Sequence, residues 1–278
     1  MATMPSMLSL AALADGQVQY RSAGLANQAT HVLLHGIGSG SASWSSQLAA
    51  AEQARHLRLL AWEAPGYGLS SALASTTPLA QDYARRMWQW LDHLQIQTPI
   101  CLVGHSLGAL MAASAARLQP QRVRRLVLLA PARGYGEASA EERARVLQSR
   151  LHSLQTLGPL GMANARASAM LSPQARPEWI AAVREIMSQI RPAGYTQAVH
   201  MLCSGRLLND VRQLTQPITV ASGEADGITT PQACDEVALA AGQRRVSLGP
   251  VGHACALEAS KAVNELLHLS VNTENLNG

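Results

Sequence analysis

The chain of 278 residues is long enough for one large α/β domain or for a domain with an insertion. Its composition, 47% hydrophobic and 14% charged, is ordinary for a soluble globular protein and supplies ample material for a core. The net charge of +4 comes from arginines scattered along the chain, because Lys261 is the sole lysine. A nucleic-acid-binding surface needs a denser basic stripe, so we expect no nucleic-acid partner.

The cysteines indicate a reducing compartment, because Cys101, Cys203, Cys234 and Cys255 form no C-x-x-C pair. We therefore expect free, buried thiols rather than disulfides. The mildly apolar start, residues 1–14, has no basic residue before its apolar run, which argues against a secretory signal. No stretch approaches the roughly 20 apolar residues of a membrane span. We predict a cytoplasmic protein with no membrane contact.

Strand-like and helix-like segments alternate through the first half of the chain. Short apolar, β-prone runs predict strands at residues 17–21, 30–34, 57–62, 99–103 and 125–130. Apolar residues at helical spacing predict helices at 43–55, at 79–94 and in the segment that ends at Leu118. Such alternation is typical of a parallel sheet covered by helices on both faces.

The pattern changes in residues 132–206, which hold no convincing strand. Helix-forming stretches at 138–157, 162–171 and 177–190 are broken by Gly-Pro and Ser-Pro pairs. Met162 and Trp179 in this segment either form the core of a small helical subdomain or line a pocket, and both roles can hold at once.

The α/β pattern then resumes. Strands are expected at 218–221 and 244–248, helices at 231–241 and 257–269, and a frayed polar tail at 272–278. The chain thus divides into a first core part (1–131), a helical insertion (132–206) and a second core part (207–278).

The sequence Gly104-His105-Ser106-Leu107-Gly108 fits the G-x-S-x-G pattern and lies between an expected strand and an expected helix. A sharp turn there holds the central serine at a strained backbone angle, with its oxygen projecting from the end of the sheet. Side chains at either glycine would collide with the neighbouring strand and helix. Since the helix N-terminus also favours negative charge, we predict that Ser106 is a nucleophile.

A serine hydroxyl needs a base within hydrogen-bond reach and an acid that fixes the tautomer of that base. His253 fits the base better than the other eight histidines, because it lies in the loop after the expected strand at 244–248. Asp226 fits the acid, because it follows the strand at 218–221. Rival acids are Glu224, Asp210 and Asp235.

An oxyanion hole is expected from the backbone N–H groups of Leu107 and of Ile37, which lies in the glycine-rich loop after the strand at 30–34. Gly36 and Gly38, the two neighbours of Ile37, remain alternatives for this second donor. Substrate contacts are expected from His35, Gly36, His105, Met162 and Trp179. Three arginines of the insertion are candidates for binding an acidic group of the substrate, but we favour exposed surface positions for them: Arg184, Arg191 and Arg206.

These features together resemble the α/β-hydrolase superfamily over nearly the whole chain, and the order Ser106, Asp226, His253 is that of its catalytic triad. The resemblance implies an α/β-hydrolase fold, with an eight-stranded, mostly parallel sheet and a helical lid inserted after the sixth strand. The chain is similar to lidded carboxylesterases, enol-lactonases and meta-cleavage carbon–carbon hydrolases. The matching motifs are His35-Gly36, the loop 65–70, the pentapeptide 104–108, residues 223–226 with Pro231, and Gly252-His253 with Glu258.

Departures from the family patterns reduce the number of activities that fit this chain. A serine nucleophile argues against typical epoxide hydrolases and haloalkane dehalogenases, which form an ester on a carboxylate. Family members often carry Asp where this chain has Glu63. Meta-cleavage enzymes often show Asn and Met around the serine and Trp after the histidine, whereas this chain has His105, Leu107 and Ala254. Ester or lactone hydrolysis is therefore favoured over carbon–carbon cleavage.

We predict a serine hydrolase that cleaves a small-molecule ester or lactone through an acyl-enzyme on Ser106 and needs neither a metal nor an organic cofactor. Two other enzymatic hypotheses are a meta-cleavage carbon–carbon hydrolase and a cofactor-free acyltransferase or perhydrolase. A ligand receptor on the same fold is the non-enzymatic alternative. The sequence favours no oligomeric state.

Overall fold

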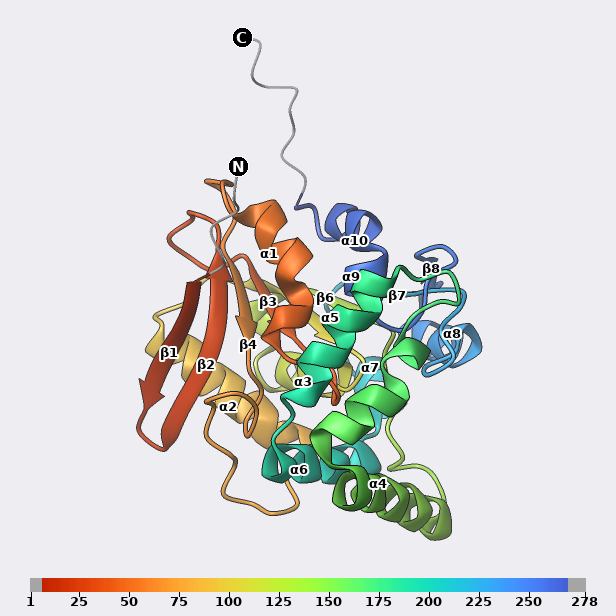
Figure 1. Cartoon of the computed structure of the whole chain (residues 1–278). Coiled ribbons are helices and arrows are strands. Elements are labelled where there is room, and N and C mark those ends of the chain that lie inside the picture. Colours follow the sequence, from red (N-terminus) through yellow and green to blue (C-terminus); the bar gives the residue numbers. More distant parts are fainter. Residues whose placement is uncertain (1–6, 270–278) are drawn as a thin grey trace.

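One eight-stranded sheet runs through the computed structural model, which describes residues 7–269 (Figure 1). The strand order is β1-β2-β4-β3-β5-β6-β7-β8, with β1/β2 and β2/β4 antiparallel and the other neighbours parallel. The predicted eight-stranded, mostly parallel sheet is confirmed. The strands are β1 (Met7–Leu13), β2 (Gly16–Ala23), β3 (His31–Leu34), β4 (Leu59–Trp62), β5 (Ile100–His105), β6 (Val123–Leu129), β7 (Ile218–Ser222) and β8 (Val246–Ser247).

The central strands are continuous apolar runs because helices cover both of their faces. Every residue of β3, β4 and β5 is buried. Successive side chains along β3 point into different cores, Val32 toward one and Leu33 toward the other. The first core includes residues of α2 (Ala80–His93), α3 (Gly108–Leu118), α7 (Leu207–Arg212) and α8 (Pro231–Ala240). The second includes residues of α1 (Ser45–Ala51), α9 (Cys255–Glu258) and α10 (Ser260–Leu266).

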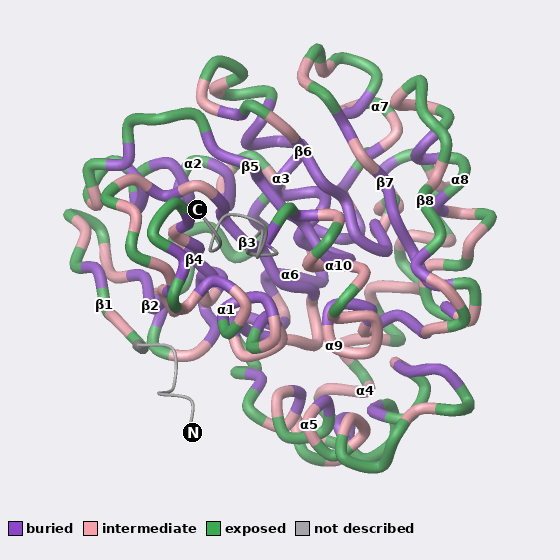
Figure 2. The backbone as a smooth tube through the Cα atoms, turned by 90° about the horizontal axis from the view of Figure 1, so that it is seen from above, coloured by how far each residue is buried: buried purple, intermediate pink, exposed green. Residues whose placement is uncertain are grey.

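Three helices form an insertion after β6 and before α7: α4 (Ala140–Arg166), α5 (Pro177–Ser188) and α6 (Pro192–Ser204), drawn in green to teal in Figure 1. Two predicted helices merge into α4, which is kinked where Gly158 takes a φ of 60° before Pro159. Most of α6 is buried, whereas α4 and α5 are largely intermediate or exposed (Figure 2). Helix α6 is therefore the most buried helix of the insertion.

The structure differs from the sequence predictions at several elements. The predicted first strand is the second, because β1 precedes it as an edge strand with Leu8 and Leu10 exposed. Helix α6 was not predicted, although Pro192 stands at its first position, where proline is favoured. Helix α1 is shorter than predicted, α7 was not predicted, and β8 has only two residues. The predicted last helix is broken at Ala259 into α9 and α10.

The polar tail predicted at 272–278 lies outside the described residues. No helix within residues 7–269 combines the length and apolarity needed to cross a lipid bilayer.

Candidate active site

The G-x-S-x-G segment forms the predicted sharp turn between β5 and α3. Ser106 has a φ of 52°, a left-handed value that costs energy for a non-glycine residue. Its backbone N–H donates to the Leu129 carbonyl of β6 at 2.9 Å, which fixes the turn against the sheet. A Cβ at Gly104 would lie 2.5 Å from the Gly108 carbonyl oxygen, and one at Gly108 would lie 2.3 Å from the Leu34 carbonyl oxygen. Both predicted collisions are confirmed.

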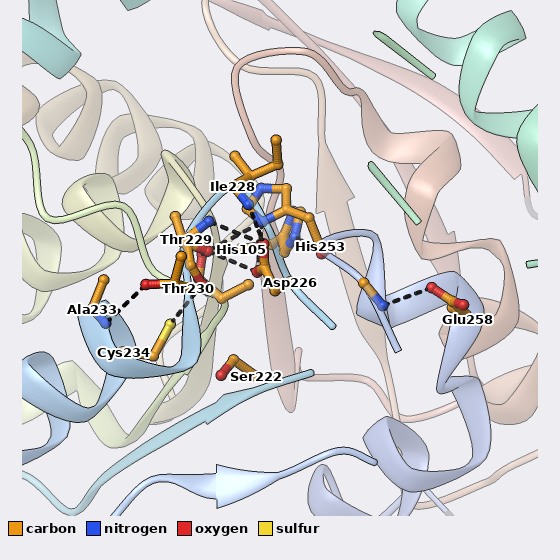
Figure 3. Close-up of polar contacts among 12 residues, drawn as sticks. His105, Ser222, Asp226, Ile228, Thr229, Thr230, Ala233, Cys234, His253 and Glu258 are labelled. Atoms are coloured by element: carbon orange, nitrogen blue, oxygen red, sulfur yellow. Dashed lines mark hydrogen bonds and ion pairs between the residues drawn. The ribbon is translucent and has the colours of Figure 1, made fainter. Parts of the chain in front are cut away.

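Asp226 and His253 meet in loops that follow β7 and β8 (Figure 3). His253 Nδ1 and Asp226 Oδ2 are 2.9 Å apart, and both residues are buried. The two loops are tied together by backbone hydrogen bonds from Glu224 N to the Gly249 carbonyl at 2.9 Å and from Ala225 N to the Val251 carbonyl at 3.0 Å. The pair is thus held by the backbone as well as by its own contact.

The environment of Asp226 favours its ionised form. Burial pushes the pKa of this carboxyl upward, but the hydrogen bond and the charge of His253 hold it below its usual value. The backbone N–H groups of Ile228 and Thr229 donate to Oδ1 at 2.8 and 3.0 Å and act in the same direction. A carboxylate with these partners orients the imidazole with its proton on Nδ1.

Thr229 is a site residue that the sequence analysis did not identify. Its Oγ1 lies 2.9 Å from Asp226 Oδ2, 3.1 Å from His253 Nδ1 and 3.0 Å from the Ala130 carbonyl oxygen (Figure 3). The hydroxyl therefore links the acid and the base to the end of β6. A threonine three residues after the acid was the only sequence signal.

The rival acids lie elsewhere. Glu224 is exposed and forms an ion pair with Arg245 at 3.1 Å. Asp210 pairs with Arg117, and Asp235 also pairs with Arg245. Of the four acids considered, Asp226 is the one in contact with His253.

The loop after β3 lies directly against the serine. A Cβ at Gly36 would be 3.0 Å from Ser106 Cβ and 3.5 Å from Ser106 Oγ. The backbone N–H groups of Ile37 and Leu107 have no hydrogen-bond acceptor within residues 7–269. Both residues line the cavity that contains Ser106. Two donors are therefore available beside the serine.

His35 and Tyr67 hold this loop from the side. His35 Nδ1 donates to the Gly36 carbonyl at 2.8 Å, and its Nε2 accepts from Ala64 N at 3.0 Å. Burial lowers the pKa of His35, so the neutral ring that this pattern requires is favoured. The Tyr67 hydroxyl donates to the Ile37 carbonyl at 2.8 Å. His35 is buried beneath this loop and does not line the cavity.

His105 lines the cavity and also supports the opposite loop. Its Nε2 donates to the His253 carbonyl oxygen at 2.8 Å. Burial, with the charge of His253 adding to it, lowers the pKa of His105 to about 3. With its neutral form favoured in this way, His105 positions the His253 backbone through this hydrogen bond.

Ser106 and His253 face one cavity of about 260 Å³. Within the described residues no hydrogen bond joins Ser106 Oγ to the His253 ring, and such contacts are often long before substrate binds. Met162 lines the cavity as expected, whereas Trp179 does not. Trp179 instead packs beside the core with the Arg176 guanidinium 4.0 Å from its ring centroid.

The helical insertion supplies much of the cavity wall. Met162 and Arg150 come from α4, Met187 from α5, and Tyr195 from α6. The three arginines that were candidates for binding an acidic group are exposed, as we favoured, and lie outside the cavity lining: Arg184, Arg191 and Arg206.

Glu258 fastens the insertion to the histidine loop. Its carboxylate accepts from Gly252 N at 2.8 Å and from Ser172 N at 3.0 Å, and the Ser172 hydroxyl also donates to it. A backbone bond from Ala254 N to the Met170 carbonyl at 2.7 Å reinforces the contact. The segment between α4 and α5 is therefore anchored next to His253.

Residues 7–269 contain no group of three or more His, Cys, Asp or Glu side chains arranged to hold a metal ion. The chemistry available at this site is that of a serine, a histidine–carboxylate pair and two free backbone donors.

Comparisons with known proteins agree with this architecture. The sequence profile of the alpha/beta hydrolase fold family matches residues 32–260. RutD of Variovorax paradoxus (strain S110), a proposed carbamate hydrolase, is 34% identical over 150 residues, which are 54% of this chain and 54% of that protein. The chain therefore aligns with about half the length of this relative.

Solved structures share the fold across almost the whole chain. The enol-lactonase from Burkholderia xenovorans LB400 has a TM-score of 0.82 at 24% identity, covering 94% of this chain and 98% of that one. A thermophilic esterase from Thermogutta terrifontis has a TM-score of 0.82 at 19% identity, covering 95% and 97%. At these identities the likeness concerns the fold alone.

Proposed function

Because the chain belongs to the alpha/beta hydrolase family of enzymes, we propose that it is a serine hydrolase that cleaves a carboxylic ester or lactone through an acyl-enzyme on Ser106. The observation that carries the proposal is the strained Ser106, with a φ of 52°, in one cavity with the hydrogen-bonded His253–Asp226 pair. A serine needs that strain and those partners only if its oxygen reacts.

In this mechanism Ser106 Oγ attacks the substrate carbonyl while His253 Nε2 takes the serine proton. The Ile37 and Leu107 N–H groups donate to the oxyanion of the tetrahedral intermediate. His253 then passes the proton to the leaving alcohol, and the acyl group remains on Ser106. Water then enters, gives a proton to His253 and attacks the acyl carbonyl; as the acid leaves, His253 returns the proton to Ser106 Oγ. Asp226 keeps the proton of the resting imidazole on Nδ1 throughout.

The helical insertion acts in this proposal as a lid, so that the chain divides at 1–131, 132–206 and 207–278 into core, lid and core. Support comes from the lining that α4, α5 and α6 contribute to the cavity. A largely apolar wall of this kind suits a small-molecule acyl or alcohol group. The four cysteines are buried and unpaired, which supports a cytoplasmic location.

The test is hydrolysis of 4-nitrophenyl esters, from acetate to decanoate, by the wild type and by Ser106→Ala. We expect activity that the substitution abolishes, with a chain-length optimum that reports the size of the cavity. Activity that survives Ser106→Ala contradicts the mechanism.

The alternative functions are distinguished by adding other substrates and ligands to this assay. A chromogenic ring-fission dienoate that bleaches faster than any ester is hydrolysed indicates carbon–carbon cleavage. An added alcohol or peroxide that diverts the acyl group indicates an acyltransferase or perhydrolase. Tight ligand binding without any turnover indicates a receptor.

A further inference from the structure

The charges around the cavity all have one sign. Its lining includes Arg133, Arg150 and Arg166, and no lining residue is an aspartate or a glutamate. Arg150 and Arg166 belong to α4 of the helical insertion, and Arg133 belongs to the segment that leads into it. An otherwise largely apolar cavity with only positive side chains favours a ligand with a negative group.

Arg150 differs from the other two arginines in its surroundings. Arg133 is exposed and its guanidinium already binds Glu236 of α8. Arg166 is exposed at the end of α4. Arg150 is half-buried, and within residues 7–269 its side chain forms neither an ion pair nor a hydrogen bond. A partly desolvated cation without a partner is costly unless a ligand supplies the opposite charge.

Arg150 and Ser106 line the same cavity. Its lining also includes Ile37, in the loop that lies against the serine. An anion held by Arg150 would therefore lie within the same substrate-binding space as the scissile bond.

On the premise of the proposed hydrolase function, we infer that the substrate carries a carboxylate remote from the scissile ester or lactone bond, and that Arg150 binds this carboxylate. A guanidinium presents two parallel N–H donors to a carboxylate, which fixes its orientation as well as its position. The acid group then selects half-esters or lactones of dicarboxylic acids over neutral esters of equal length.

The test compares mono-4-nitrophenyl esters of glutarate, adipate and pimelate with the same compounds methylated on the free carboxylate. We expect the wild type to prefer the acidic member of the best pair in kcat/KM. Arg150→Gln should reduce that acid-to-neutral ratio roughly ten- to hundredfold, the range for losing a hydrogen-bonded charge partner. Arg150→Lys should reduce it less. Arg184→Gln, an exposed position outside the lining, should leave both rates unchanged.

A second measurement does not depend on turnover. Calorimetry of free adipate is made on Ser106→Ala and on the double variant with Arg150→Gln, with the wild type in parallel. We expect adipate to bind and the added substitution to weaken it at least tenfold.

The outcomes separate the two hypotheses. Hydrolysis that needs Ser106 but shows no acid preference, or a ratio unchanged in Arg150→Gln, overturns the inference and leaves the hydrolase function intact. Adipate binding that depends on Arg150 without any hydrolysis overturns the function and keeps the anion site. Adipate that fails to bind overturns the inference.

Discussion

Replacing Asp226 by asparagine should disable the histidine by reversing its tautomer. Oδ1 accepts two backbone N–H groups, from Ile228 at 2.8 Å and Thr229 at 3.0 Å, so the asparagine oxygen must occupy that position. Its amide nitrogen then replaces Oδ2 and directs an N–H at His253 Nδ1, 2.9 Å away. The imidazole can accept that bond only with its own proton on Nε2, where it cannot take the proton of Ser106.

The expected loss in kcat is about 10³- to 10⁴-fold, or roughly 4–5.5 kcal/mol, by analogy with the same exchange in serine proteases. The assay is steady-state hydrolysis of the best 4-nitrophenyl ester, with circular dichroism to verify folding. Glu224→Gln is the matched control, because Glu224 lies two residues away but is exposed and paired with Arg245. A folded Asp226→Asn variant that keeps more than about a tenth of the activity refutes the tautomer argument.

The same substitution has a signature in stability. The pKa of Asp226 is held below its usual value in the folded protein, chiefly by His253 against the opposing effect of burial. The carboxylate therefore stabilises the fold above its unfolded pKa of about 3.9, and this contribution is lost as the pH falls through the folded pKa. The difference in free energy of unfolding between wild type and Asp226→Asn should shrink below about pH 4. Urea titrations at several pH values measure it, and a difference that grows toward low pH contradicts the assignment.

Three further substitutions or probes test the supports of the site. Gly108→Ala should cost about 1–3 kcal/mol of unfolding free energy, because its Cβ would meet a carbonyl oxygen at 2.3 Å, whereas Gly227→Ala, which has open space, should cost little in the same urea titration. Glu258→Gln should lose about 1–3 kcal/mol and raise hydrogen exchange at Ser172, since one amide oxygen replaces two carboxylate acceptors. A thiol reagent at pH 8 should label no cysteine quickly in the native protein and all four in urea, because all are buried and burial raises the pKa of Cys101 and Cys234 to about 11.

The opposite result in each of these three experiments would have a specific physical meaning. Equal stability of the two glycine variants would mean that α3 can move away from β3 at no cost. Unchanged exchange in Glu258→Gln would mean that the backbone contact of Ala254 alone anchors the insertion. A rapidly labelled native thiol would mean that its surroundings open.

The sequence predicted the parts of the fold that depend on local patterns. Fully buried strands such as β3 and β5 are short apolar runs, and the glycines around Ser106 mark a turn that few residues fit. Edge strand β1 lacks this signal because its outward side chains are also apolar. Helix α6 begins with Pro192 at the first helical position, where proline is favoured, so the missed signal was a helix start; most of the helix is then buried in the first core.

In the candidate site, too, some residues follow from local sequence patterns and others depend on packing. Ser106, Asp226 and His253 follow strands whose ends meet at one edge of the sheet, so chain order and loop position were enough to bring them together. Thr229 and Arg150 depend instead on how separate loops and helices pack in three dimensions. His35 and Trp179 lie outside the cavity lining for the same reason, because position in the sequence does not determine which way a side chain points.

The most direct test of the central claim is the site of covalent labelling by a fluorophosphonate, located by intact-mass measurement and peptide mapping. The account predicts one phosphonyl group per chain, on Ser106, with loss of esterase activity in proportion to labelling and no label on Ser106→Ala. Complete labelling of a different residue, or full activity in a protein labelled at Ser106, would contradict it.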